Sequence, residues 1–310
     1  MAEVKGHVSF VFPTVKPFSL REWLFLLFLG NVQLVAEGGE EKMTHLLEKM
    51  RVNNPLVHNM TNQVVANDVA NGLLAMGASP VMAYAVEEVA SIASISKALV
   101  LNIGTLTSAG VEAMMVAGIA ANKADVPVVL DPVGVGASSY RQEKVREILA
   151  AVKVTLIRGN SGEIANLAEV EWQAKGVDAG KGKVSVSEMA NKVAQRFNCI
   201  VAVSGEVDYI TNGRESAEIS NGVSLMAQVT GMGCLLSGIC GAFIACANKT
   251  EVIEAVITAH AAYGIVGEKA KQQSNGPGSF RVHFMDGLAN LTVPQYQQHK
   301  KINRWEGVVK

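Results

Sequence analysis

The 310-residue sequence is poor in charged and aromatic residues and has no excess of charge of either sign. Charged residues make up 18% and aromatic residues 5%, and the formal net charge is -1 at pH 7. A chain without a broad positive field has no means of attracting nucleic acid or an acidic membrane surface, so we expect neither as a partner. The 49% of apolar residues can bury a large core, which excludes a disordered or collagen-like chain and favours a soluble metabolic protein with a small partner.

Cysteine is also scarce, with only four residues. Their spacing lacks the pairing of a zinc site, and their density is far below that of a secreted disulfide scaffold, so we expect reduced thiols in the cytoplasm. Cys199, Cys240 and Cys246 fall in apolar stretches and are expected to be buried small hydrophobic residues. Cys234 differs from them because it follows a glycine-rich loop.

The N-terminal region has an apolar run at residues 23–29 that is too short to span a bilayer. A cluster rich in glycine and glutamate follows at residues 37–42 and is typical of a linker. We therefore expect residues 1–42 to be an N-terminal extension, residues 43–294 to form a single domain, and residues 295–310 to be a C-terminal tail. Short apolar runs alternate with helical patterns through most of the predicted domain, without a second linker.

This alternation predicts an α/β fold in which helices flank both faces of a central, mostly parallel sheet. An Asn-Gly pair at 212–213 predicts a hairpin within residues 208–219. The expected strands are 56–59, 81–83, 99–103, 128–131, 155–158 and 200–204, and the expected helices are 63–76, 109–123, 142–151, 187–197, 235–246 and 252–271.

The most informative segment is Val229-Thr230-Gly231-Met232-Gly233-Cys234, which leads into an apolar helix. A glycine-rich loop at a helix start directs backbone N–H groups and the positive end of the helix dipole at one point, where a phosphoryl group can bind. We expect residues 231–234 to form an anion hole. We expect Cys234 to be the catalytic group, with a thiol pKa lowered by the helix N-terminus so that the sulfur can accept a proton.

Polar residues follow the apolar strands, where ligands bind in open parallel sheets. Asp131 and Glu163 follow neighbouring predicted strands and could hold Mg²⁺ through its water shell, while Arg158 could meet a phosphate. Each acid also has a purely structural reading. Glu163 could simply favour the dipole of a helix first turn, and Asp131 could form a turn before Pro132.

Five segments, in this order along the chain, resemble the hydroxyethylthiazole kinase family of the ribokinase-like superfamily. They are Asn59-Met60-Thr61-Asn62, Ser79-Pro80-Val81-Met82-Ala83, residues 131–136, Arg158-Gly159-Asn160 and Gly231-x-Gly233-Cys234-Leu235. The resemblance covers roughly residues 45–292. It implies ATP-dependent phosphorylation of the hydroxyethyl group of 4-methyl-5-(2-hydroxyethyl)thiazole, with Mg²⁺, in thiamine biosynthesis or salvage.

The resemblance also implies a role for each matching residue. Asn62, Met82 and Gly231 would contact the thiazole, Arg158 and Ser204 would contact ATP, and Asp131 and Glu163 would organise the metal. Cys234 stands where most ribokinase-like enzymes carry an aspartate base. The family further implies a homotrimer whose active sites lie between subunits, so that Met82 would serve a neighbour's site.

Two residues depart from the family's pattern, and three other readings compete with it. Met232 and Ser204 stand where threonine is common.

The competing hypotheses are a related kinase for hydroxymethylpyrimidine or pyridoxal, a non-catalytic protein on the same fold, and a nicotinamide enzyme, for which Leu236 stands where a third glycine belongs. We expect His260 to be a packing or surface histidine.

Overall fold

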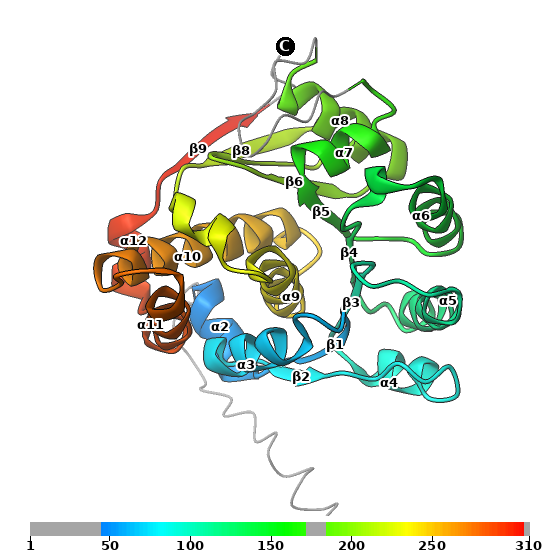
Figure 1. The fold of residues 1–310 in the computed structure, drawn as a ribbon, viewed down its shortest axis with the longest axis horizontal. Helices are drawn as coiled ribbons and strands as arrows, with labels where there is room; N and C mark the ends of the chain where they lie inside the picture. Colours follow the sequence, from blue (N-terminus) through cyan, green and yellow to red (C-terminus); the bar gives the residue numbers. More distant parts are fainter. Residues whose placement is uncertain (1–44, 172–183, 307–310) are drawn as a thin grey trace, which may run out of the picture. The chain divides into compact units, whose positions relative to one another are not determined.

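Residues 45–171 and 184–306 are described in the computed structural model, and their strands form one nine-stranded sheet (Figure 1). The strand order is β2-β1-β3-β4-β5-β6-β7-β8-β9; neighbours are parallel from β2 to β6 and antiparallel from β6 to β9. The strands are β1 (Leu56–Met60), β2 (Ser79–Val81), β3 (Ala98–Asn102), β4 (Val128–Asp131), β5 (Leu156–Asn160), β6 (Ile200–Ser204), β7 (Asp208–Thr211), β8 (Glu215–Ile219) and β9 (Ile302–Glu306).

Helices cover both faces of the sheet, which confirms the predicted fold class (Figure 1). One face carries α2 (Leu46–Asn53), α3 (Ala66–Met76), α9 (Met232–Ile244), α10 (Val252–Gln272), α11 (Pro277–Asn290) and α12 (Val293–His299). The other carries α4 (Val89–Ile95), α5 (Ser108–Lys123), α6 (Ser139–Ala151), α7 (Ser161–Leu167) and α8 (Val186–Phe197). Two short 3₁₀ helices are η1 (Val135–Ala137) and η2 (Ser224–Gln228).

Burial on both faces explains why the central strands are continuously apolar. In β3, Val100 packs into the core on the α9 side, whereas Leu99 and Leu101 pack into the core on the α5 side. All five residues of β3 are buried. A strand in this position has no solvent-facing side, so it shows none of the alternation typical of a half-buried strand.

The edge strand β2 begins and ends two residues before the predicted strand 81–83. Its three residues are all half-buried, and its one neighbour in the described sheet is β1. The prediction followed hydrophobicity and excluded Pro80, but proline is tolerated on an edge strand because no ladder partner needs its missing N–H. The structure therefore corrects the position of this strand.

The N-terminal extension predicted at residues 1–42 lies outside the described residues. The segment 295–310, expected as a tail, supplies most of α12 and the strand β9, which pairs antiparallel with β8 through register pairs such as Ser216 with Trp305. Among the helices that the structure describes, none has the length and apolar character needed to cross a membrane.

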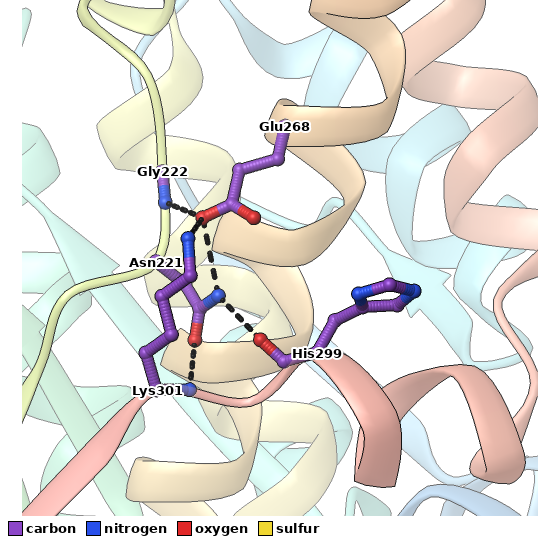
Figure 2. Close-up of polar contacts among 5 residues, drawn as sticks. All are labelled: Asn221, Gly222, Glu268, His299 and Lys301. Atoms are coloured by element: carbon purple, nitrogen blue, oxygen red, sulfur yellow. Dashed lines mark hydrogen bonds and ion pairs between the residues drawn. The ribbon is translucent and has the colours of Figure 1, made fainter.

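A polar cluster around Asn221 joins the C-terminal segment to α10 (Figure 2). The Asn221 side chain donates to the carbonyl of His299 at 2.9 Å and accepts from the backbone N–H of Lys301 at 2.8 Å. The same amide donates to Glu268, which also accepts from the backbone N–H of Gly222, both at 3.1 Å. Glu268 thereby holds the start of the segment that runs from β8 to α9.

Candidate active site

The start of α9 has backbone N–H groups that donate no hydrogen bond to any described residue. Its N-cap is Gly231, which offers no capping side chain, and the first helical bond of the chain here runs from the N–H of Leu235 to the carbonyl of Gly231 at 2.8 Å. The N–H groups of residues 232–234 precede that bond and have no acceptor among the described residues. Of the residues predicted to form an anion hole, Gly231 is thus the N-cap of α9 and residues 232–234 lie in its first turn, where free backbone N–H groups are common.

Gly231 has to be a glycine at this position for two reasons. Its φ of +90° lies in the left-handed region that side chains disfavour. A Cβ atom would also lie 2.7 Å from Cγ1 of Val65, which is closer than van der Waals contact allows. The tight approach packs the glycine loop against the segment that follows β1.

Arg158 lies beside this helix start. A Cβ atom on Gly233 would be 2.9 Å from Nη1 of Arg158, and the other terminal nitrogen, Nη2, donates to Oγ of Ser204. The guanidinium is buried, and its Nε has no hydrogen-bond partner among the described residues. Burial opposes the charge, but several nearby groups, with Asp131 and Asp208 the largest contributors, together outweigh it and raise the pKa of Arg158, so the group remains a cation.

Asp131 ends β4 and is almost completely buried, with 1% of its surface exposed. Its Oδ2 accepts from Nδ2 of Asn102 at 2.7 Å and from Oγ of Ser237 at 2.8 Å. Burial is the main cause that raises the pKa of Asp131 to about 6, while Arg158 opposes the rise and Glu163 adds to it. The carboxylate is therefore a buried anion held by neutral donors at neutral pH.

Glu163 lies in the first turn of α7 and has a defined structural role. Its Oε2 accepts from the backbone N–H of Asn160 in a capping box, and its Oε1 accepts from the N–H of Gly134, each at 2.8 Å. The structural reading of Glu163 as a first-turn carboxylate is thus correct in geometry. It does not exclude a second role, because each carboxylate oxygen has a further lone pair.

The acids fit a magnesium ion that is held mostly through water. Among the described residues no group of three or more His, Cys, Asp or Glu side chains could hold a metal directly. Asp131 nevertheless ends β4, Glu163 follows the neighbouring strand β5, and the charge of Glu163 contributes to raising the pKa of Asp131. Mg²⁺ keeps several waters and needs only one or two carboxylates when phosphate supplies further oxygens, so this donor set suits it.

Cys234 is linked to Asp131 through two asparagines. Nδ2 of Asn62 lies 3.3 Å from Sγ of Cys234 and donates to Oδ1 of Asn102 at 3.0 Å. Nδ2 of Asn102 in turn donates to Asp131. The predicted pKa shift of the thiol is wrong in direction. Burial, with a contribution from Asp131, raises the pKa of Cys234, although the amides of Asn102 and Asn62 oppose the rise.

Met232 points away from the helix mouth and into the core. Its side chain is 9% exposed, and Tyr263 of α10 contacts both its sulfur, at 3.8 Å, and its carbonyl oxygen, to which the hydroxyl donates at 2.7 Å. The side chain that departs from threonine therefore packs in the core and does not lie at the start of the helix. Met232 contributes its N–H to the helix mouth, while its side chain fills the core.

Met82 lies one residue beyond β2 and is half-buried against the core cluster of the α9 face. Asn62 follows β1, the strand beside β2, so the two residues leave the same edge of the sheet from adjacent strands. Two strands, β1 and β3, separate β2 from β4 and Asp131. The structure thus brings Asn62 into contact with Cys234, whereas Met82 lies next to the edge strand β2.

Several polar residues of the site were missed in the sequence. Asn102 could have been found, because it follows the apolar run of β3 just as Asp131 follows that of β4, and the two are register partners. Ser237 lies one helical turn after Cys234, but its bond to Asp131 depends on how α9 crosses the sheet. His260, expected to be a packing or surface histidine, is buried as packing requires, but it also bonds Asp208.

Comparison with solved structures first defines the class. A ribokinase-like superfamily protein from Enterococcus faecalis V583 matches with a TM-score of 0.56 and 11% identity, covering 80% of this chain and 91% of that one. A pyridoxal kinase from Staphylococcus aureus, solved with AMP-PCP and pyridoxal, matches with a TM-score of 0.55 and 14% identity, covering 81% and 98%. The fold is therefore that of the ribokinase-like kinases.

Closer relatives then define the family. The model of the hydroxyethylthiazole kinase family matches residues 47–294, so the chain belongs to that family. Hydroxyethylthiazole kinase from Haemophilus influenzae (strain PittEE) is 52% identical over 83% of this chain and 98% of its own. The corresponding protein of Listeria monocytogenes serotype 4a (strain HCC23) is 51% identical over 83% and 95%. A solved hydroxyethylthiazole kinase from Pyrococcus horikoshii OT3 is 38% identical with a TM-score of 0.76, covering 84% and 98%.

Proposed function

We propose that this chain transfers the γ-phosphoryl group of ATP to the hydroxyl of 4-methyl-5-(2-hydroxyethyl)thiazole, in thiamine biosynthesis or salvage. Family membership supports the substrate, and the arrangement at the start of α9 supports the reaction. The single observation that carries the proposal is the first turn of α9, whose backbone N–H groups lie beside Arg158 and whose Cys234 side chain is contacted by Asn62.

The nucleotide side of the site is supplied by Arg158 and Ser204. Phosphoryl transfer depends mainly on positioning and on stabilising the charge that spreads over the phosphoryl oxygens. A buried guanidinium beside the first turn of α9 suits that task, because its charge is little screened by water. The N–H groups of residues 231–234 would receive the transferring group as an anion hole.

Asp131 and Glu163 are the residues that would hold Mg²⁺, through water and together with phosphate oxygens. A bound magnesium ion supplies charge stabilisation for the nucleotide phosphates. The chain's own contribution is to keep Asp131 ionised and correctly aimed. The bonds from Asn102 and Ser237 to Oδ2 do this and leave Oδ1 without a partner among the described residues.

The thiolate form of Cys234 Sγ would accept the proton of the substrate hydroxyl and become the thiol, while the hydroxyl oxygen bonds to the γ-phosphorus and the phosphorus–oxygen bond to ADP breaks. Since burial raises the pKa of Cys234, the thiolate is the minor form before reaction, and the neutral thiol serves as a hydrogen-bonding contact beside the acceptor oxygen. A loose transition state needs little help from a base. The phosphorus–oxygen bond to the leaving group is largely broken before the substrate hydroxyl oxygen has to carry a full negative charge.

The thiazole side would be formed by Asn62, Gly231 and Met82. Asn62 and Gly231 are tied together, because Val65 donates its N–H to the Asn62 carbonyl at 3.3 Å and packs on Gly231. Met82 stands farther out, which supports a homotrimer in which it serves a neighbour's site. Tyr84 and Val86 follow Met82 closely in the chain and are both 43% exposed, so such a neighbour could cover them.

We also place the reaction in the cytoplasm, where ATP is abundant. All four cysteines are described, and all are free thiols, as reducing conditions require.

A substrate panel tests the proposed function. The purified chain is incubated with ATP, Mg²⁺ and one alcohol at a time: the thiazole alcohol, hydroxymethylpyrimidine or pyridoxal. Phosphate ester is measured by mass spectrometry and ADP by a coupled assay. We expect ester from the thiazole alcohol at a kcat/KM at least about a hundredfold above the others. Preferential turnover of pyridoxal or the pyrimidine would assign the chain a different substrate, and release of ADP without any ester would reject kinase activity toward all three.

A further inference from the structure

A buried ion pair lies behind the nucleotide side of the site. Nδ1 of His260, in the middle of α10, is 2.7 Å from Oδ2 of Asp208, the first residue of β7. The His260 side chain is fully buried, and Asp208 is 15% exposed. Burial lowers the pKa of His260, but Cys240 and the bond to Asp208 outweigh it and raise that pKa to about 9.

Asp208 passes this contact on to the turn that carries Ser204. Its second oxygen, Oδ1, accepts from the backbone N–H of Gly205 at 3.0 Å. Ser204 ends β6 immediately before that glycine, and its hydroxyl accepts from Arg158. The carboxylate of Asp208 therefore bonds the backbone of the β6–β7 turn with one oxygen and the imidazole of His260 with the other.

Charge balance gives His260 a second effect on Arg158. Asp208 is near enough to Arg158 to raise the pKa of the guanidinium. Without the bond from His260, the carboxylate of Asp208 would compete with Ser204 and with phosphate for that guanidinium. The His260 ring occupies one oxygen of Asp208 from the α10 side, so that Arg158 stays directed at the start of α9.

Other residues of α10 hold the remaining parts of the phosphate site. Tyr263, three residues after His260, bonds the carbonyl of Met232 in the first turn of α9. Glu268, eight residues after His260, holds Gly222 at the start of the segment leading to that turn (Figure 2). His260 thus belongs to a set of α10 side chains that hydrogen-bond the loops around the proposed phosphate site.

We propose that His260 is a positioning residue for the nucleotide: through Asp208 it fixes the turn at residues 204–208 and keeps Arg158 aligned with the first turn of α9. The inference rests on the proposed function, since it takes ATP as the ligand of Arg158 and Ser204. His260 itself touches no substrate.

Direct binding of ATP, measured by calorimetry without any alcohol present, tests this role. His260→Leu removes the donor, whereas His260→Asn keeps an N–H near the position of Nδ1. Val145→Ala is the control, because Val145 is a fully buried residue of α6, remote from α10. We expect His260→Leu to raise the Kd for ATP by about tenfold, His260→Asn to restore it to within about threefold, and the control to leave it unchanged.

The same variants are then compared by steady-state kinetics. A positioning role predicts that the KM for ATP rises in His260→Leu while the KM for the thiazole alcohol stays within about twofold. Unchanged ATP binding in folded His260→Leu, or an equal loss in Val145→Ala, would overturn the inference. If the leucine variant does not fold, Asp208→Asn and Asp208→Ala replace it, with Asn expected to bind ATP the more tightly and equal affinities overturning the role. ATP binding without phosphorylation of the alcohol would reject the proposed substrate and leave this comparison intact.

Discussion

The Nδ2 atom of Asn62 lies 3.3 Å from the sulfur of Cys234, so an amide N–H points at the proposed proton acceptor. An amide donor stabilises negative charge on the sulfur and would do the same for a carboxylate in its place. In the protein as it stands, burial and Asp131 outweigh this donor and keep the thiol neutral. Cys234 can therefore act as a base only through its minor thiolate form.

Replacement of Cys234 should show how much the base contributes to the rate of phosphoryl transfer. We expect Cys234→Ala to lower kcat by about 10- to 100-fold without abolishing activity. Cys234→Asp should retain or raise kcat, because the Asn62 amide can bond the new carboxylate. Cys246→Ala, at a buried cysteine beyond the far end of α9, is the matched control and should keep full activity. Complete loss of activity in folded Cys234→Ala would show that the thiol is indispensable.

Asp131 should show opposite effects on activity and stability. We expect Asp131→Asn to lower kcat/KM by about a thousandfold. At pH 8 the same variant should be more stable by about 1–3 kcal/mol in urea unfolding, because the wild-type fold carries a buried anion whose pKa is raised to about 6. Ser237→Ala, which removes a donor and keeps the charge, should instead lower stability at pH 8. Loss of stability in Asp131→Asn would contradict this account.

The pH dependence of the wild-type protein follows from the same group. Asp131 has a higher pKa in the folded state than the ordinary value of 3.8, so its contribution to stability is fully present below about pH 4 and is lost as pH rises through about 6. Activity should change in the opposite sense and rise as the carboxyl ionises near pH 6. Urea unfolding and kcat/KM measured from pH 5 to 8 check both signs. Activity that stays flat across this range would separate Asp131 from the reaction.

Met232→Thr tests whether the first turn of α9 works through its backbone. The Met232 side chain is packed against Tyr263, so the change should cost about 1–3 kcal/mol of stability while leaving the KM for ATP within about twofold. Tyr263→Phe removes the bond to the Met232 carbonyl and should lower kcat/KM by about tenfold. A large rise in the KM for ATP in Met232→Thr would assign the side chain to the phosphate site.

Gly233→Ala tests the contact between the helix start and Arg158. The added methyl group would meet Nη1 of Arg158 at 2.9 Å and displace the guanidinium, so we expect the KM for ATP to rise by about tenfold. Gly278→Ala is the control, because a Cβ there meets nothing within 4 Å. A variant that binds ATP as well as the wild type would place the nucleotide away from Arg158.

The interior of the fold could be predicted from the sequence, while its margins could not. The runs that became β4 and β6 were predicted at their observed bounds, because strands buried on both faces have an unbroken apolar signal. β9, by contrast, is the polar segment Ile302–Glu306, and its extended form depends on pairing with β8. No local pattern contains that information. The position of β2 was missed for a similar reason, since it is an edge strand with a proline.

The site could be predicted as a set of strand ends, but not as a network. Polar residues after apolar runs indicated Asp131, Arg158 and Glu163, and the glycine loop indicated the helix mouth. The partners of these residues depend on strand register and helix crossing, which explains why Ser237 and the bond between His260 and Asp208 were missed. The thiol pKa was wrong because the helix dipole was weighed alone, whereas desolvation is the larger effect on Cys234.

The central claim is that the first turn of α9 receives the γ-phosphate of ATP. A crystal structure of the chain with a non-hydrolysable ATP analogue, Mg²⁺ and the thiazole alcohol tests it most directly. We expect γ-phosphate oxygens within about 3 Å of the backbone N–H groups of Gly233 and Cys234, with the substrate hydroxyl between that phosphate and the sulfur. A γ-phosphate bound elsewhere, with these N–H groups facing only water, would contradict the account.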